Sequence, residues 1–281
     1  MRLIFLFVVV CNIAFGQQNL NQEINSLKDS INLYRHSNPV KALNFGFEVL
    51  KIADFSNPTF DLIAVHSRIG EILYYRGLYS DAIGFYNETL KLFESLPIEQ
   101  RIEKNIINPP WVLLNIGNIY FTNKDYVKAA LKYNEALMNF KLFENTENQN
   151  YGFTTVYDNL GSISEVKGDL KLAEEYYLKA YEIRKKNNKI EDLMFSEMHL
   201  LTLNMKQHNT FNINKHLIEI ERLHNEGKNN FSGKDYRKSF PTRNYGYAYS
   251  HMGNYYLKIN KHEVAKEFFE AAIEILSAFP S

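Results

Sequence analysis

The sequence predicts an all-α protein in which about six helix hairpins stack into a solenoid. Four segments of 23 residues align without a gap, at 68–90, 115–137, 159–181 and 251–273. Each has a glycine at its third position, an alanine at its fifteenth and an aromatic residue at its nineteenth. Apolar residues recur at helical spacing on both sides of a short turn in the middle of each segment. Self-similarity at a fixed period is typical of repeat proteins, which commonly act as binding surfaces.

The repeat predicts that the chain after residue 16 is a series of antiparallel helix pairs. The polar and basic stretch 226–243 reads as a long loop before the last pair. The first and fifth hairpins are degenerate: Gly46 occupies the nineteenth position of the first, and Leu201 replaces the glycine of the fifth. We expect hairpins near 20–54, 58–95, 109–143, 152–187, 190–226 and 244–278.

The recurrent glycine predicts a close contact, because glycine within a helix costs about 1 kcal/mol relative to alanine. We expect glycine on the first helix and alanine on the second to let the two helices approach closely, and the aromatic residue to fill the space between neighbouring hairpins. Gly77 and Gly168 are placed to end first helices in the left-handed conformation, as is Asn260. Lys124 breaks this pattern, and Asn123 is the expected substitute.

These positions resemble the tetratricopeptide repeat, which has a small residue on its first helix, an alanine twelve residues later, an aromatic four beyond it and a small residue three beyond that. Three blocks match in full, and Thr89 replaces the last alanine in the block that starts at Arg68. The glycines are 47, 44 and 92 residues apart, and 92 is twice 46, so one degenerate repeat is expected in the last interval. A period of 44–47 residues is longer than the usual 34, and such lengthened repeats are similar to those of kinesin light chains and bacterial peptide-responsive regulators. The resemblance implies a right-handed superhelix whose concave groove, lined by first helices, holds a protein or peptide.

The resemblance also assigns candidate groove residues, at two before, one after and four after each glycine. An asparagine amide both donates to and accepts from a peptide main chain, so Asn115 and Asn159 are the candidates for holding an extended ligand. An equally weighted alternative is that the two asparagines bond to neighbouring helices and only support packing. Trp111 is either an apolar anchor at the groove mouth or a core residue. The predicted peptide-binding groove comprises Arg68, Glu71, Tyr74, Trp111, Asn115, Asn118, Phe121, Asn159, Ser162, His251 and Asn254.

Composition and motifs argue against several other functions. Lys plus Arg and Asp plus Glu are balanced at 32 each, which does not favour a nucleic-acid partner. The sequence has no nucleophile motif, phosphate-binding glycine loop or metalloprotease motif, so we expect no enzymatic activity, cofactor or metal. His199, His208, His216 and His224 are eight or nine residues apart, which is not a metal-ligand spacing, and they are expected to be exposed or in the groove.

Residues 1–16 have the pattern of a secretory signal peptide: Arg2, an apolar run and small residues before Gln17. Cleavage would export the chain to the periplasm or the extracellular space. Retention as a membrane anchor is the alternative, and a lipoprotein is disfavoured because Val10 precedes Cys11. Cys11 is the only cysteine, so a mature chain of 17–281 has no disulfide, and no later run is apolar enough to span a membrane.

The sequence therefore favours a non-catalytic scaffold that binds a protein or peptide in the concave groove of the solenoid. The alternative is a structural or sensor subunit of a cell-envelope complex or signalling system.

Overall fold

The computed structural model describes residues 20, 22–53, 55, 59–103, 109–142, 146–230 and 239–279. Throughout these ranges the regular structure is helical, and the predicted signal segment 1–16 lies outside them. The chain divides into two compact units, Met1–Phe143 and Glu144–Ser281.

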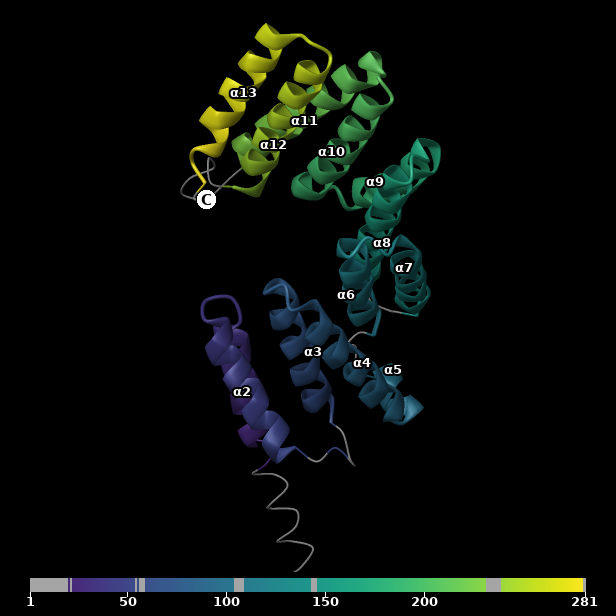
Figure 1. Cartoon of the computed structure of the whole chain (residues 1–281), viewed down its shortest axis with the longest axis vertical. Coiled ribbons are helices and arrows are strands. Elements are labelled where there is room, and N and C mark those ends of the chain that lie inside the picture. The colour runs from purple at the N-terminus through teal and green to yellow at the C-terminus, as the bar shows by residue number, and fades with distance from the viewer. Residues whose placement is uncertain are drawn as a thin grey trace, which may run out of the picture. The chain divides into compact units, whose positions relative to one another are not determined.

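Unit 1 is a series of antiparallel helices. A helix over 22–34 shares a hydrophobic core with α2 (Pro39–Ile52), through buried Ile31, Ala42 and Val49. The hairpin of α3 (Phe60–Tyr75) and α4 (Tyr79–Ser95) follows, then a short α5 (Ile98–Glu103) that the sequence did not predict, and then the hairpin of α6 (Pro109–Thr122) and α7 (Tyr126–Phe140) (Figure 1).

Unit 2 holds three hairpins, each made of two consecutive helices. They are α8 (Thr146–Val166) with α9 (Leu170–Asn187), α10 (Ile190–Lys206) with α11 (Thr210–Asn230), and α12 (Phe240–Lys258) with α13 (His262–Leu276) (Figure 1). α10 also packs against α9 and α12, so it is in contact with all three hairpins. In the degenerate hairpin α10–α11, Leu201, Ile213 and Ile220 are fully buried.

The third-position glycines make room for an aromatic ring. A Cβ atom on Gly117 or Gly161 would lie 2.5 Å from the ring of Tyr133 or Tyr177, and Gly70 and Gly253 have the same relation to the aromatic residues of their hairpins. The close contact is therefore between glycine and the ring at the nineteenth position of the same hairpin. We expected the glycine and the alanine to meet and the aromatic residue to fill the space between neighbouring hairpins. That prediction was incomplete, because the aromatic ring also covers the glycine of its own hairpin. Gly46, which replaces that ring in the first hairpin, is covered by Ile69 instead.

Five hairpin turns share one geometry. The residue that ends each first helix has a positive φ, at Gly77 (75°), Lys124 (62°), Gly168 (81°), His208 (54°) and Asn260 (60°). In each, the N–H of this residue donates to the carbonyl three residues earlier, and the next N–H donates to the carbonyl five residues earlier. The prediction for Asn123 was wrong: Lys124 itself takes the left-handed conformation, because the hydrogen-bond register fixes which residue must do so.

The predicted loop 226–243 is partly helical. α11 continues to Asn230. One turn before this end, Arg222 Nη1 and Glu226 Oε2 form an ion pair of 2.6 Å on the exposed face of the helix. α12 begins at Phe240, after Ser239 caps it by accepting a hydrogen bond from the N–H of Thr242. Polar composition indicated a loop, yet polar residues also suit an exposed helix end. Residues 231–238 lie outside the described residues.

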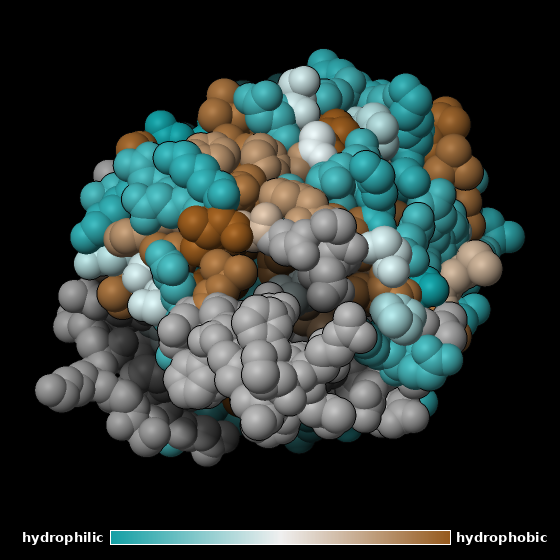
Figure 2. Space-filling view, turned by 90° about the horizontal axis from the view of Figure 1, so that it is seen from below, coloured by the Kyte–Doolittle hydropathy of each residue, from teal (hydrophilic) through white to brown (hydrophobic). Residues whose placement is uncertain are grey.

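The described surface is mixed in character. Figure 2 shows hydrophilic side chains interspersed with smaller hydrophobic areas on one face. Within the described ranges, no helix combines the length and the hydrophobicity that a membrane span requires.

Candidate functional site

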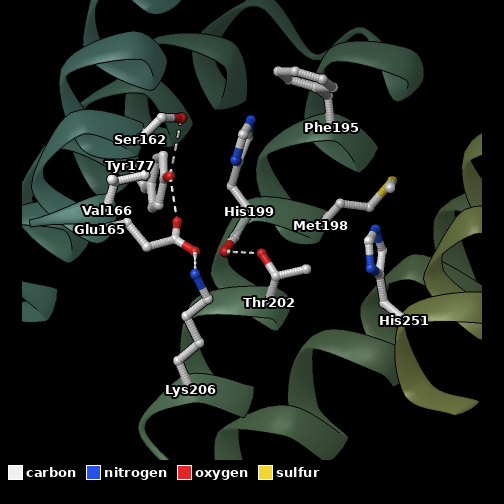
Figure 3. A pocket seen from close by; sticks show the side chains of 10 residues that line it. All are labelled: Ser162, Glu165, Val166, Tyr177, Phe195, Met198, His199, Thr202, Lys206 and His251. Atoms are coloured by element: carbon white, nitrogen blue, oxygen red, sulfur yellow. Dashed lines mark hydrogen bonds and ion pairs between the residues drawn. The ribbon is translucent and has the colours of Figure 1, made fainter. Parts of the chain in front are cut away.

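Two adjoining pockets lie along α10 in unit 2, and we call them the α10 pockets. Their volumes are about 430 Å³ and about 340 Å³, and they share Thr202, Lys206 and His251 in their linings. The first is walled by side chains from α8, α9, α10 and α12, as Figure 3 shows, and the second by α10 and α12 and the turn residues His208 and Ile259. The first helices of three consecutive hairpins thus contribute to one hollow.

Three of the predicted groove residues line the α10 pockets. Ser162 reaches the first pocket from α8, Asn254 reaches the second from α12, and His251 lines both. The Nδ2 of Asn254 donates to the carbonyl of Ser250 at 3.0 Å and so holds the exposed amide against its own helix. Asn159 is half-buried on α8 and is not among the lining residues.

A chain of hydrogen bonds forms one wall of the first pocket (Figure 3). The hydroxyl of Tyr177 lies 3.3 Å from the Ser162 hydroxyl and donates to Glu165 Oε2 at 2.7 Å. Glu165 Oε1 is 2.6 Å from Lys206 Nζ. Burial raises the pKa of Tyr177, so the phenol stays protonated and remains the donor. This wall therefore presents a fixed carboxylate whose charge Lys206 balances.

His199 forms the floor of this pocket between two aromatic rings. Its imidazole is stacked on Tyr177 at 4.6 Å between centroids, and it makes a T-shaped contact with Phe195 at 4.7 Å. Burial lowers the pKa of His199, and the nearby Asp158 acts in the opposite direction. Burial also lowers the pKa of His251. Both side chains are therefore neutral imidazoles near pH 7.

A buried ion pair between two of the helices that line the pocket was not predicted. Arg184 Nη2 on α9 lies 2.5 Å from Asp158 Oδ2 on α8, and its Nη1 donates to the Ser196 hydroxyl on α10 at 2.9 Å. This contact joins three helices that carry the pocket lining. None of these residues is at a repeat position, so the repeat pattern could not indicate that they pair.

In unit 1, the predicted charged residues pair with one another. Arg68 Nη1 lies 2.6 Å from Glu71 Oε2 on the same helix, and Arg35 Nη1 approaches this carboxylate at 3.2 Å. Tyr74 meets the rings of Tyr75 and Tyr79, at 5.3 Å and 5.8 Å between centroids. Partners within unit 1 thus engage all three of these groove candidates.

The other predicted residues of unit 1 lie on α6. The ring of Trp111 contacts the edge of Phe140 on α7 at 4.8 Å, which is a packing contact within the hairpin. Phe121 meets Tyr126 across the turn at 5.5 Å. Asn115 faces Tyr86 of the preceding hairpin: burial raises the pKa of Tyr86, and the Asn115 side chain partly opposes this shift.

The model of the tetratricopeptide repeat family matches residues 154–187 and 246–275. The chain carries tetratricopeptide repeats. The two matched ranges correspond to the hairpins α8–α9 and α12–α13, which both contribute residues to the α10 pockets.

Solved structures share this repeat fold. The chain is similar to BtubC (BKLC) from P. vanneervenii, with 17% identity, a TM-score of 0.56 and coverage of 92% of this chain and 91% of that one. It is similar to the apo form of RapI, with 16% identity and a TM-score of 0.67, and the match covers 93% of this chain and 66% of RapI. It is also similar to the Rap conjugation gene regulator of plasmid pLS20, solved in complex with the Phr* peptide, with 13% identity, a TM-score of 0.55 and coverage of 93% and 75%. At these identities the likeness concerns the fold, and no curated protein matches the sequence.

In two of the four repeats the residue after the glycine is next to the hydroxyl of the ring that covers the glycine. Asn118 Oδ1 accepts a hydrogen bond from the Tyr133 hydroxyl at 2.8 Å, and Ser162 lies beside the Tyr177 hydroxyl. In the last repeat the ring is Phe269, which has no hydroxyl, and Asn254 bonds to its own helix. Asn118 therefore has a packing role that is sufficient to explain its presence.

The four histidines of the fifth hairpin region have separate surroundings. His199 and His208 line the α10 pockets, as predicted for groove histidines. His216 Nδ1 instead lies 2.6 Å from Glu197 Oε2, and His224 stacks on Tyr245 at 4.3 Å, so both are packing residues. Among the described residues, no group of three or more His, Cys, Asp or Glu side chains is arranged to hold a metal ion.

Proposed function

We propose that this chain is a non-catalytic scaffold that binds a peptide segment of a partner protein, and that the α10 pockets hold part of that segment. The observation that carries the proposal is the pair of adjoining pockets lined by first helices of three consecutive repeats. Predicted groove residues from two of these helices, α8 and α12, line the pockets. The peptide complex of the Rap regulator, which has the same fold, supports a peptide as the ligand class.

The lining indicates the kind of peptide. Phe195 and Met198 offer apolar surface in the first pocket, and Tyr255 does so in the second. Lys206 is balanced by Glu165, whereas Lys258 has no acidic partner in the described part of the chain. We therefore expect an apolar side chain to enter the first pocket and an acidic group to lie near Lys258.

The test uses a peptide selected from a displayed library against the purified chain, with Kd measured by fluorescence anisotropy. His251→Ala combined with Lys258→Ala is expected to weaken binding at least about tenfold, since it removes roughly 1.4 kcal/mol or more of contact free energy. Lys266→Ala on α13 is the matched control, because Lys266 is exposed and outside both pockets. Equal Kd values for the two variants would overturn the proposal.

The asparagine prediction is tested with the same peptide. Asn115 and Asn159 lie in different units, so Asn115→Ala and Asn159→Ala are made separately. Weaker binding with an unchanged melting temperature supports contact with the peptide main chain. A lower melting temperature with unchanged binding would assign that asparagine to packing.

We propose that residues 1–16 are removed and that the scaffold acts outside the cytoplasm. N-terminal sequencing of protein recovered from cell-envelope and secreted fractions is expected to begin at Gln17. An intact residue 1 would indicate a retained anchor instead.

A further inference from the structure

A buried histidine in unit 1 has no evident structural role. His66 on α3 is 5% exposed, and neither of its ring nitrogens has a hydrogen-bond partner among the described residues. Buried polar groups are almost always paired, and an unpaired one lowers the stability of the fold. Among the described aromatic rings, the imidazole meets those of Phe55 and Phe85, at 5.8 Å and 5.7 Å between centroids. An apolar side chain at this position would make the fold more stable, so the presence of an imidazole points to a ligand that bonds to one of its ring nitrogens.

His66 lines a pocket that is distinct from the α10 pockets. Its volume is about 570 Å³, and it lies between α2, α3 and α4. A Cβ atom built on Gly84 of α4 would meet no atom within 4 Å, so the space above this glycine is open. The volume is in the range of small-ligand and side-chain sites.

The pocket is acidic. Asp81 and Glu88 line it from the same face of α4, seven residues apart, and no lysine or arginine lines it. Within the described part of the chain, Asp81 has no basic partner. Glu88 has only Lys91 at 3.5 Å, whose side chain is 77% exposed. Such an exposed pair is weak, and a cationic ligand can displace it.

Two aromatic side chains form another part of the lining. Phe47 of α2 and Phe85 of α4 line the pocket with their centroids 6.3 Å apart and their planes inclined by 51°. Aromatic faces next to carboxylates attract organic cations. A guanidinium fits better than an ammonium, because it has five N–H donors in a plane and several separated acceptors surround it here.

We propose that this pocket binds a guanidinium group, carried by an arginine side chain of a partner protein. Asp81 and Glu88 are the counter-ions, Phe47 and Phe85 provide the aromatic faces, and one ring nitrogen of neutral His66 accepts an N–H of the ligand. Burial lowers the pKa of His66 while Glu88 opposes the shift, which agrees with a neutral acceptor. The site lies in unit 1 and does not depend on peptide binding at the α10 pockets.

The experiment titrates the full chain with small probes and follows ¹⁵N-labelled histidine imidazoles by NMR, with Kd from calorimetry. N-acetylarginine amide represents an arginine within a chain, and N-acetylcitrulline amide is its uncharged isostere. We expect the arginine probe to bind at about millimolar Kd and to shift the His66 resonances, and the citrulline probe to bind at least about tenfold more weakly. Agmatine represents a free guanidine compound. If it binds more than about tenfold more tightly than the arginine probe, the ligand is a free metabolite and the assignment to a protein arginine is wrong.

Variants locate the binding. Asp81→Asn with Glu88→Gln is expected to abolish binding, whereas Glu94→Gln, an exposed change outside the pocket on the same helix, leaves it unchanged. Gly84→Leu fills the open space and is expected to abolish binding in a chain that is as stable as wild type, while Gly84→Ala retains binding. Equal binding of the citrulline probe, absence of arginine binding at 10 millimolar (roughly ten times the expected Kd), or full binding by Gly84→Leu would each overturn the proposal.

Discussion

At the scale of single residues, the repeat is held together by glycine-to-ring contacts. Glycine is required because a methyl group would overlap the ring that covers it. In two repeats the ring hydroxyl also has a partner in the residue that follows the glycine, as with Tyr133 and Asn118. The aligned positions predicted a close contact at the glycine. They did not predict which side chain makes it, because an aromatic residue sixteen positions later can point in several directions.

Gly117→Ala is expected to lower the free energy of unfolding by about 1–3 kcal/mol, since the new Cβ would lie 2.5 Å from Tyr133 Cε1 and force the ring to move. Urea unfolding followed by circular dichroism measures this. Gly84→Ala is the control: no atom lies within 4 Å of its Cβ, so it should raise the free energy of unfolding by about 0.5–1 kcal/mol. Equal effects of the two substitutions would contradict the account.

The histidines make stability depend on pH. Burial lowers the pKa of His66, His199, His224 and His251 from 6.5, so the unfolded chain binds more protons than the folded chain below that pH. Stability is therefore full above pH 6.5 and falls as the pH drops below it. Urea unfolding at pH 7.5 and 5.5 should show this loss.

His66→Leu should reduce the loss of stability between pH 7.5 and 5.5. His262→Gln should not, because His262 is exposed on α13. The prediction fails if His66→Leu leaves the pH dependence unchanged.

At the scale of elements, the turn that joins two helices is the most regular feature. Its hydrogen bonds recur at five places with glycine, asparagine, lysine or histidine at the left-handed position. Sequence alone indicated the turns with Gly77, Gly168 and Asn260, since glycine favours this conformation and asparagine tolerates it. It missed Lys124 because a lysine does not mark a turn, and it missed the extent of α11 and α12 because a polar helix end resembles a loop.

Lys124→Gly is expected to raise the free energy of unfolding by about 0.5–1 kcal/mol. Lysine is strained at a φ of 62°, and the relief of that strain outweighs the greater freedom of glycine in the unfolded chain. Asn123→Gly, one residue earlier and without a positive φ, is expected to lower it. Thermal melts of both variants provide the comparison, and stabilisation by Asn123→Gly alone would show that the turn register is wrong.

At the scale of the whole molecule, the sequence predicted the fold class because the residue types at the repeat positions are those that packing between two helices requires. It predicted part of the candidate site for the same reason: Ser162, His251 and Asn254 are at fixed distances from repeat glycines, and they line the α10 pockets. The Asp158–Arg184 ion pair and the pocket at His66 could not be predicted, because they depend on side chains from three helices at positions that the repeat does not constrain.

The most direct test of peptide binding at the α10 pockets is NMR of the chain labelled with ¹³C at the methionine methyl groups, titrated with the selected peptide. Met198 lines the first pocket and Met205 the second, whereas Met138 is 68% exposed on α7 in unit 1. Single Met→Leu substitutions assign the three resonances. The account predicts that the Met198 and Met205 methyl resonances shift in proportion to bound peptide while that of Met138 stays in place. Saturable binding that leaves Met198 and Met205 unmoved would contradict it.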